Sequence, residues 1–232
     1  MTHSAHPYAH RLGIIRDWKS RWYGTDKKQY RDFLCADTTV REFLKKRLKG
    51  MYVAAVDIER SDTVMRVIVK TSRPGIIIGR QGEGAQKLKK DIVRELHKKG
   101  LADLQDIKID VEEVRNPESN AAIVAEMCAE GLEKRMPFRR ILKQTVEKVM
   151  ANRDVLGVRI SMAGRLGGAE MSRKEQIKKG RVPLQTLRAD VDFAKTEAYI
   201  PYNGLIGIKV WVYKGEIFDE DQPNLVAQAN RA

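Results

Sequence analysis

The chain has 232 residues, 42% of them hydrophobic, and its 44 Lys and Arg outnumber its 31 Asp and Glu, which gives a formal net charge of +13. A chain of this length can bury two modest cores, and the excess of positive charge favours a polyanion, above all nucleic acid, as the partner. No uninterrupted apolar run is long enough to span a bilayer, and the first ten residues lack the apolar stretch of a secretory signal. We therefore expect a cytoplasmic protein with no membrane partner.

The two cysteines, Cys35 and Cys128, lie far apart in the sequence and belong to no Cys-x-x-Cys unit. Cysteines of this kind are typical of ordinary reduced thiols in the cytoplasm. Neither a disulfide scaffold nor a zinc site is predicted.

The chain begins with residues 1–37, which are rich in Trp, Tyr and charged side chains but show no clear periodicity. This pattern is typical of an extension that becomes ordered on a partner. Thr38 and Thr39 can then cap a helix, in which apolar residues recur at helical spacing until Gly50. The first domain is expected to open with that helix.

A glycine-rich loop follows two predicted strands. Residues 52–58 and 64–70 are β-rich runs separated by a polar turn, and residues 107–111 form a third such run. Between the second and third runs, Gly79 and Gly82 enclose a Gly-x-x-Gly loop that leads into a helix. Glycines let the main chain approach a phosphodiester backbone closely, and the helix N-terminus behind the loop offers unpaired N–H groups and a positive dipole end. The loop is therefore predicted to clamp a nucleic-acid backbone.

The helix after the loop is amphipathic, with one face expected to pack and the other to attract anions. Its apolar face consists of Ala85, Leu88, Ile92 and Leu96. Its opposite face carries Lys87, Lys90, Arg94 and Lys98.

Three other interpretations of the glycines compete with a backbone clamp. A nucleotide-binding P-loop needs Lys and Ser or Thr directly after its second glycine, where this chain has Ala85 and Gln86. A dinucleotide fingerprint needs a different glycine order and a longer alternation of parallel strands and helices. A glycine turn that only reverses the chain is the minority alternative.

The order helix, strand, strand, short helix, Gly-x-x-Gly, helix, strand resembles the KH domain of the type found in prokaryotic proteins (type II). In that family the loop clamps about four nucleotides of single-stranded RNA or DNA. The resemblance implies a KH RNA-binding domain at residues 38–115. The RNA contacts expected from its loop and helix are Arg73, Gly79, Arg80, Gln81, Gly82, Lys87, Lys90 and Arg94.

After residue 116 the pattern changes to two consecutive helices, the second of which starts at Pro137. Apolar residues gather on one face of the second helix, and cations form a stripe that begins just before it. We expect this stripe to contact RNA and not only solvent, because guanidinium groups grip phosphate in a bidentate fashion. The cationic stripe consists of Lys134, Arg135, Arg139, Arg140 and Lys143.

The rest of the chain alternates strongly and predicts three strands. Their alternating apolar positions are Val158, Ile160 and Met162, then Leu187, Ala189, Val191 and Phe193, then Ile206, Ile208, Val210 and Val212. Between the first and second strands, a glycine-containing basic stretch is expected to form a long loop that neutralises several phosphates. The predicted fold class is therefore α+β, with two α/β-sandwich domains, the second made of two helices packed on a small β-sheet.

Several longer motifs occur along the chain. In chain order they are His6-Pro, Arg11-Leu-Gly-Ile, Arg73-Pro-Gly-Ile with its Gly-x-x-Gly loop, Phe138-Arg-Arg, Gly164-Arg-Leu-Gly-Gly-Ala-Glu, Gly180-Arg-Val-Pro-Leu-Gln-Thr-Leu-Arg-Ala-Asp and Gly207-Ile-Lys-Val-Trp. This set of motifs resembles the family of small ribosomal subunit protein number three, of the bacterial type. The resemblance covers nearly the whole chain except the tail. It implies a structural constituent of the small ribosomal subunit, not an enzyme, that binds ribosomal RNA in the subunit head and contacts neighbouring head proteins.

The resemblance also implies that the chain lines the channel through which messenger RNA enters and assists the opening of messenger helices. By motif match, Arg139, Arg140 and Lys143 would carry this role, within the cationic stripe. The residues expected to bind ribosomal RNA are His6, Arg11, Arg165, Arg173, Lys174, Lys178, Lys179, Arg181 and Arg188. No cofactor, metal or small-molecule substrate is implied.

The expected organisation has four parts. These are an N-terminal extension at residues 1–37, the KH domain at 38–115, a C-terminal ribosomal domain at 116–213 and an acidic, flexible tail at 214–232. Many members of the family end in a long basic tail, whereas this chain ends short and acidic. The tail is therefore not assigned an RNA contact.

An enzyme acting on nucleic acid, such as a nuclease or a lyase, is one competing function. Three histidines at the N-terminus could bind a metal, but they are better suited to pairing or stacking against RNA; they are His3, His6 and His10. The acidic cluster suits a solvated face or a basic protein neighbour better than two-metal catalysis. Its members are Asp103, Asp106, Asp110, Glu112 and Glu113.

A free KH regulator of single-stranded RNA is the second competing function. Aromatic stacking residues beside the loop would favour it. The chain instead has Ile76, Ile77 and Ile78 there, which offer only aliphatic surface.

Overall fold

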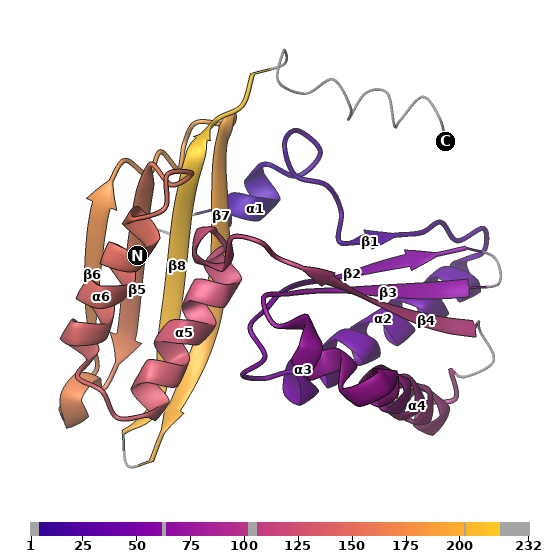
Figure 1. The fold of residues 1–232 in the computed structure, drawn as a ribbon. Helices are drawn as coiled ribbons and strands as arrows, with labels where there is room; N and C mark the ends of the chain where they lie inside the picture. Colours follow the sequence, from indigo (N-terminus) through magenta and orange to yellow (C-terminus); the bar gives the residue numbers. More distant parts are fainter. Residues whose placement is uncertain (1–4, 62–63, 102–105, 202, 219–232) are drawn as a thin grey trace. The chain divides into compact units, whose positions relative to one another are not determined.

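Figure 1 shows the fold of the computed structural model, which describes residues 5–61, 64–101, 106–201 and 203–218. The chain divides into two compact units, one formed by Trp18–Pro117 and the other by Met1–Asp17 together with Glu118–Ala232. His3, Asp103 and the part of the predicted acidic tail after residue 218 lie outside the described residues. None of the described helices combines the length and the apolar character needed to cross a bilayer.

The first unit is a four-stranded sheet with helices on one face. The strand order is β1-β2-β3-β4; β2 and β3 pair antiparallel, and the two outer pairs are parallel. The elements are β1 Ser20–Arg21, α2 Lys27–Arg47, β2 Val53–Arg60, β3 Val64–Thr71, α3 Pro74–Ile78, the 3-10 turn η1 Arg80–Gly82, α4 Glu83–Lys98 and β4 Asp106–Glu113. From α2 to β4 this is the order of elements predicted for a KH domain.

Strand alternation and helical periodicity bring the apolar side chains of this unit into one core. Figure 1 shows α2 and α4 on the same side of the sheet. The predicted apolar face of α4 packs there, with Leu88, Ile92 and Leu96 buried and Ala85 half-buried. The other buried members of the core are Ala36, Val40, Leu44, Leu48, Ile58, Met65, Val67, Val69, Ile77 and Ile107.

The extension predicted at residues 1–37 does not stand apart from the two units. Helix α2 begins at Lys27 and not near Thr38, and β1 pairs with β2. Met1–Asp17 belongs to the second unit, and the chain from Trp18 onward belongs to the first. The described residues of this segment contact the two units, and the expectation that the segment becomes ordered on a partner stays a prediction.

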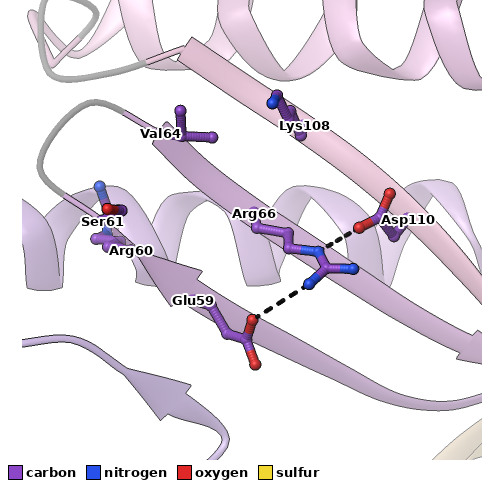
Figure 2. Close-up of a pocket in the computed structure, with 7 residues that line it drawn as sticks. All are labelled: Glu59, Arg60, Ser61, Val64, Arg66, Lys108 and Asp110. Carbon is purple, nitrogen blue, oxygen red and sulfur yellow. Dashed lines mark hydrogen bonds and ion pairs between the residues drawn. The ribbon is translucent and has the colours of Figure 1, made fainter. Parts of the chain in front are cut away.

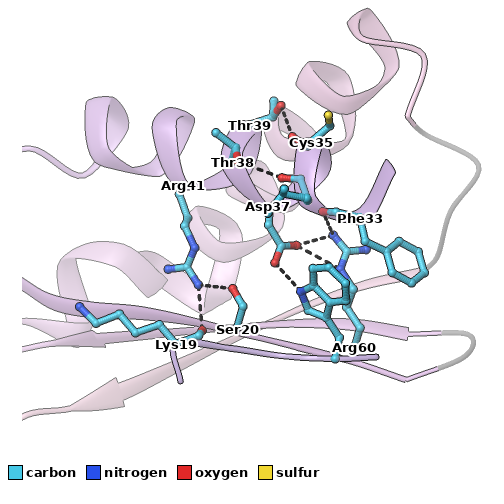
Figure 3. A network of polar contacts seen from close by, with 11 residues as sticks. Lys19, Ser20, Phe33, Cys35, Asp37, Thr38, Thr39, Arg41 and Arg60 are labelled. Carbon is cyan, nitrogen blue, oxygen red and sulfur yellow. Dashed lines mark hydrogen bonds and ion pairs between the residues drawn. The ribbon is translucent and has the colours of Figure 1, made fainter. Parts of the chain in front are cut away.

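A buried ion pair holds α2 against the sheet (Figure 3). Asp37 on α2 and Arg60 at the end of β2 lie 2.5 Å apart between Oδ1 and Nη2, and their side chains are 4% and 2% exposed. The Trp22 indole N–H donates to the second Asp37 oxygen at 2.8 Å, and the Arg60 guanidinium lies 4.7 Å from the centre of the Phe33 ring. Both carboxylate oxygens are thus engaged, which offsets the desolvation that burial of the charges requires.

The variant Asp37→Ala leaves the Arg60 guanidinium buried without its carboxylate. We expect the free energy of unfolding of the first unit to fall by about 3–5 kcal/mol. Hydrogen exchange of peptides from this unit, followed across a urea titration, measures the change. The matched control is Asp110→Ala, which removes the exposed partner of Arg66 and is expected to cost far less. Equal losses in the two variants would contradict the importance given to the buried pair.

The second unit packs two helices on an antiparallel four-stranded sheet of order β6-β5-β8-β7. Figure 1 shows α5 and α6 over the same face of the sheet. The elements are α1 Pro7–His10, η3 Pro117–Ser119, α5 Ala121–Glu133, α6 Phe138–Met150, β5 Gly157–Gly164, η4 Leu166–Gly168, β6 Arg173–Gly180, β7 Ala189–Ile200 and β8 Gly204–Glu216. The predicted fold class, α+β with two helix-on-sheet domains, is confirmed.

The main core of this unit lies between the helices and the sheet. Asn120 caps α5 by accepting hydrogen bonds from the N–H groups of Ala122 and Ile123. Cys128 is buried within the core, and desolvation of the thiolate raises the pKa of its thiol to about 11. The strand residues of the core are Val158, Ile160, Met162, Ala198, Ile200, Ile206, Ile208, Val210 and Val212.

The basic stretch predicted as a long loop is instead strand β6 at the edge of the sheet. It pairs with β5 from Gly157↔Gly180 to Gly164↔Arg173 without a register shift. The prediction was wrong because charged side chains at nearly every position conceal the period of two that identifies a strand. Lysine-rich edges of this kind protect a sheet from pairing with another chain.

The opposite face of the sheet is covered at one end by a second, smaller cluster. Val191 and Phe193 face away from the helices and pack beside Trp211 and Tyr213. The segment between β6 and β7 and helix α1 complete this cover, since the His6 ring meets the Phe193 ring at 4.7 Å. The N-terminal residues are thus a structural part of the second unit.

Candidate nucleic-acid interface

The Gly-x-x-Gly loop is a tight connection between α3 and α4. Three of its residues have positive φ, namely 71° at Gly79, 51° at Gln81 and 83° at Gly82. Glycine adopts these values without steric cost, whereas a residue with a Cβ atom such as Gln81 rarely does. Arg80 and Gln81 are exposed at the tip. The loop therefore presents two long polar side chains from a backbone shaped by its glycines.

Helix α4 starts directly behind the loop, at Glu83. Gly82 is its N-cap, and no side chain of the described residues caps its first N–H groups. These groups can approach an anion, since a helix N-terminus carries a partial positive charge. The carboxylate of Glu83 lies in the same first turn and lowers the local positive potential.

Gly84 allows α3 and α4 to approach each other closely, and the sequence analysis did not assign it a role. A Cβ atom at this position would lie 2.5 Å from the carbonyl oxygen of Ile77 and 2.8 Å from that of Ile78. Contacts this short to backbone atoms require the two helices to separate. The signal in the sequence was a third glycine inside the first turn of a helix, where glycine costs stability unless packing demands it.

The cations of the loop and helix all lie at the surface. Their members Arg73, Arg80, Lys87, Lys90 and Arg94 are exposed, opposite the buried face of α4. Arg73 stacks over the Tyr52 ring at 4.4 Å, and Arg94 pairs with Asp91 at 3.4 Å. The predicted arrangement is therefore possible geometrically, with the RNA contacts themselves still predictions.

The cationic stripe of the second unit lies along α6 and the turn before it. Arg139 shares Glu175 with Arg173, at 3.5 and 3.2 Å, and both guanidinium groups lie within 6 Å of the Phe138 ring centre. Arg140 and Lys143 are exposed, and neither forms an ion pair with any described residue. Carboxylates therefore compensate the positive charges of Arg140 and Lys143 less than that of Arg139, which leaves these two charges more available to an anionic partner.

The stripe begins before α6, at Lys134 and Arg135. Lys134 pairs with Glu130 one helical turn earlier at 2.6 Å, and Arg135 adopts φ 60° where the chain turns between the helices. Both side chains are exposed.

Arg11, predicted to bind ribosomal RNA, is instead a buried structural residue. Its side chain is 0% exposed. Its guanidinium donates hydrogen bonds to the carbonyl oxygens of Ala189 (2.6 Å), Pro7 (3.0 Å), Thr186 (2.9 Å), Leu184 (3.1 Å) and Pro183 (3.3 Å). Burial lowers the pKa of the guanidinium, and Asp190 opposes this shift. The assignment to RNA is wrong because a motif match cannot separate a residue kept for folding from one kept for binding.

The cations of β6 do not share one surface. Register places Arg173 and Lys179 beside the helix-facing residues of β5, and Lys174 and Lys178 on the opposite face. All four are exposed. The predicted group is therefore divided between the two faces of the sheet.

The remaining predicted RNA contacts lie in connecting segments. Arg165 donates to the carbonyl of Ala169 at 2.9 Å, and Arg188 pairs with Glu216 at 2.5 Å. Arg181 and His6 are exposed as well. Each stays a prediction.

Charges on the helix-free face of the first sheet neutralise one another (Figure 2). Arg66 binds Asp110 and lies 3.8 Å from Glu59, which pairs with Arg21 at 3.1 Å. A hollow of about 540 Å³ lies along this row, lined by Glu59, Arg60, Ser61, Val64, Arg66, Lys108 and Asp110. Two of its three cations are already paired, Arg60 with Asp37 and Arg66 with Asp110, which leaves Lys108 as its one cation without an ion pair among the described residues.

A second row on that face has the same character. Lys70 lies 3.1 Å from Asp57 and 3.7 Å from Glu112. Elsewhere in the acidic cluster, a hydrogen bond from Lys89 lowers the pKa of Asp106. The described part of the chain holds no group of three or more His, Cys, Asp or Glu side chains placed to bind a metal.

Two protein families match this chain, the KH domain family over residues 39–119 and the ribosomal protein S3 C-terminal domain family over residues 128–212. The small ribosomal subunit protein uS3 of Pseudomonas aeruginosa (strain UCBPP-PA14) is 43% identical over 233 residues, which cover 100% of this chain and 98% of that protein. The uS3 protein of Xanthomonas euvesicatoria pv. vesicatoria (strain 85-10) is 46% identical over 222 residues, or 96% and 87% of the two chains. The uS3 protein of Ruegeria sp. (strain TM1040) is 46% identical over 221 residues, or 95% and 88%.

The chain belongs to the uS3 family.

Membership of the uS3 family confirms the resemblance drawn from the sequence motifs. The KH match contains the whole Gly-x-x-Gly loop and helix α4, and the C-terminal match contains α6 and most of the antiparallel sheet. The predicted combination of a KH domain with a C-terminal ribosomal domain is therefore confirmed for this chain. The individual contacts of its residues with RNA stay predictions.

The close approach at Gly84 can be tested by Gly84→Ala. Its new methyl group would meet the carbonyls of Ile77 and Ile78, so we expect a loss of about 1–3 kcal/mol of stability and weaker binding of a single-stranded RNA oligonucleotide. Fluorescence anisotropy with a labelled oligonucleotide and urea unfolding measure the two effects. The control is Gly75→Ala in α3, where the added methyl group meets nothing within 4 Å. Equal behaviour of the two variants would show that the helix contact is unimportant.

Proposed function

We propose that this uS3-family chain is a structural constituent of the small ribosomal subunit that binds ribosomal RNA in the subunit head. The observation that carries the proposal is the similarity to uS3 proteins over the full chain. The net charge of +13 supports it, because neutralising RNA phosphates releases counterions and supplies much of the affinity. The proposed partners are small-subunit ribosomal RNA, messenger RNA and neighbouring head proteins, and the proposed location is the cytoplasmic ribosome.

The Gly-x-x-Gly loop is proposed to clamp a nucleic-acid backbone. Positive φ values at Gly79 and Gly82 support this role, since they let the main chain come close to a phosphate. The exposed cations of α4 lie on the side away from the core and supply the charge.

The cationic stripe on α6 is proposed to line the channel through which messenger RNA enters and to assist the opening of messenger helices. Arg140 and Lys143 support this role best, because they are exposed and form no ion pair with a described residue. Cations held on a rigid helix can attract the phosphates of one strand as a duplex separates.

We infer that the chain acts by binding and not as an enzyme. The charged groups of its candidate interface are predominantly Arg and Lys, which bind phosphate through charge-assisted hydrogen bonds. Such groups hold phosphates well but do not serve as general bases without a large pKa shift.

Sedimentation of a cell lysate through a high-salt sucrose gradient tests the assembly. We expect the chain to remain in the small-subunit fractions, because a structural component is held by many contacts that salt does not fully screen. Immunoblotting of the fractions measures its position. A pool that leaves the particle and stays at the top of the gradient would instead favour the free KH regulator.

Translation through a stable messenger hairpin tests the cationic stripe. Ribosomes that carry Arg139→Ala, Arg140→Ala and Lys143→Ala together should pause longer at the hairpin, because three positive charges near the messenger strand are lost. Toeprinting over time measures the pause.

The control for this experiment is the triple variant Lys45→Ala, Lys46→Ala and Arg47→Ala, which removes three exposed charges from the last turn of α2. It should leave the pause unchanged. The single variant Arg139→Ala should have a smaller effect than Arg140→Ala, because Arg139 shares Glu175 with Arg173. Unchanged pausing in the α6 triple variant would contradict the assigned role.

A further inference from the structure

The face of the second sheet that turns away from α5 and α6 carries a group of cations that the sequence analysis did not bring together. At one end this face is covered by α1 and the smaller apolar cluster. The rest of it is formed by residues that alternate with the buried core positions of the same strands. Register shows which side chains lie side by side there.

Three rows cross the four strands, each in the order β6, β5, β8, β7. The first row is Lys178, Arg159, Trp211 and Phe193, of which Trp211 and Phe193 belong to the covered apolar cluster. The second row is Gln176, Ser161, Lys209 and Lys195. The third row is Lys174, Ala163, Gly207 and Glu197. We call the five cations of these rows, Arg159, Lys174, Lys178, Lys195 and Lys209, the cationic face.

Like charges stand directly opposite each other twice on the cationic face. Arg159 on β5 is the partner of Lys178 on β6, and Lys195 on β7 is the partner of Lys209 on β8. Like charges in such cross-strand pairs are destabilising. A protein that keeps two of these pairs on one surface benefits if an anion lies over them.

Acidic neighbours compensate this charge only in part. Glu197 lies 3.9 Å from Lys195, while Arg159 donates to the neutral amide of Gln176 at 2.7 Å and stacks 4.9 Å from the Trp211 ring centre. Within the described residues, no acidic side chain forms an ion pair with Lys174, Lys178 or Lys209. One carboxylate therefore faces five cations.

The centre of the cationic face is low and flat. Ser161, Ala163 and Gly207 occupy the middle of the second and third rows, and the Ser161 side chain is buried beneath its neighbours. Small residues here leave the lysine side chains on both sides free to reach an extended charged surface. Three strand spacings give the patch a width of about 14 Å.

The helix-free face of the first sheet provides the contrast. It also carries charges on three neighbouring strands, but there Arg66 pairs with Asp110, and Lys70 pairs with Asp57 and Glu112. There Lys108 stands opposite Arg66 without an ion pair among the described residues, but Arg66 and Lys70 are neutralised by carboxylates, whereas the cationic face has one carboxylate for five cations.

We propose that the cationic face binds the phosphate backbone of an RNA duplex, and this inference rests on the proposed function in the small ribosomal subunit. Duplex RNA is recognised through its shape, its phosphates and its 2′-hydroxyl groups, which a flat cationic surface can follow. Single-stranded RNA is usually held by exposed aromatic rings that stack on bases. In the three rows the Trp211 ring is only 7% exposed and lies under Arg159, and the Phe193 ring meets the His6 ring. The exposed Tyr199 pairs with Leu205 in the next row, beyond the five cations, so the rows themselves favour a duplex.

The test compares three variants of the full chain by fluorescence anisotropy, with a blunt 20-base-pair RNA duplex and a single-stranded RNA as probes at several salt concentrations. The first variant replaces Lys178, Lys195 and Lys209 by Gln. The second replaces the same residues by Arg. The third, a matched control, replaces Arg66, Lys70 and Lys108 on the first sheet by Gln.

The Gln variant of the cationic face should bind the duplex about tenfold more weakly, with a salt slope shallower by about 2–3. The Arg variant should bind like the unchanged chain, and so should the control. The thermal midpoint of the Gln variant should not fall, because the opposed pairs no longer repel. If the triple variant does not fold, Lys209→Gln alone carries the test, with a salt slope shallower by about 1.

Unchanged duplex affinity in the Gln variant, an equal loss in the control, or a loss confined to the single-stranded probe would each overturn the inference. These outcomes are independent of sedimentation. A chain that sediments with the small subunit but shows any of them retains the proposed function and loses this inference. A chain absent from the small-subunit fractions loses the proposed function, while its duplex affinity still decides whether the cationic face binds RNA.

Discussion

The second unit depends on a positive charge that it buries completely. The Arg11 guanidinium donates to carbonyl oxygens of α1, of the segment between β6 and β7 and of the first residue of β7. An isolated buried cation would be costly, but the planar fork of an arginine can satisfy several carbonyl groups at once. Three of these carbonyls, those of Pro183, Leu184 and Thr186, belong to the segment between β6 and β7, so Arg11 fixes this segment against α1 and β7. The chain's first residues therefore fold with its last strands, and the KH unit lies between them in the sequence.

The hydrogen bonds of Arg11 also determine which part of the second sheet remains uncovered. Helix α1 and the segment before β7 lie over the apolar ends of β7 and β8, where Val191, Trp211 and Tyr213 would otherwise be exposed. The same strands continue past this cover with charged side chains at the same parity. A single strand thus serves three environments, with the helix core on one face and, on the other, first an apolar cover and then the cationic face. A substitution that removes the hydrogen bonds of Arg11 would therefore affect the cationic face only indirectly, by altering strands β7 and β8.

Sequence reasoning predicted the features that depend on periodicity. The amphipathic faces of α4 and α6, the long alternating strands and the order of elements in the KH domain all follow from apolar residues at regular spacing. It missed strand β6, because charged side chains on both faces hide the alternation that identifies a strand. It also missed the structure around Trp22, where tertiary contacts hold a segment that has no regular apolar spacing. For the candidate site, composition identified the cations but could not say which were paired. Arg11 and Arg139 are the same residue type, yet Arg11 is buried among carbonyl oxygens and Arg139 lies at the surface beside Glu175.

A net charge describes a chain less well than the positions of its charges do. Both sheets carry cations on their helix-free faces, but the number and the register of the neighbouring carboxylates differ. On the first sheet, acidic residues of β2 and β4 flank the cations of β3, so the attraction is satisfied within the fold. On the second sheet, cations of neighbouring strands oppose each other, so folding leaves a repulsion that an external polyanion would relieve. If RNA binds here as proposed, binding and stability are coupled with opposite signs on this surface, since the residues proposed to attract RNA are the ones that repel one another when RNA is absent.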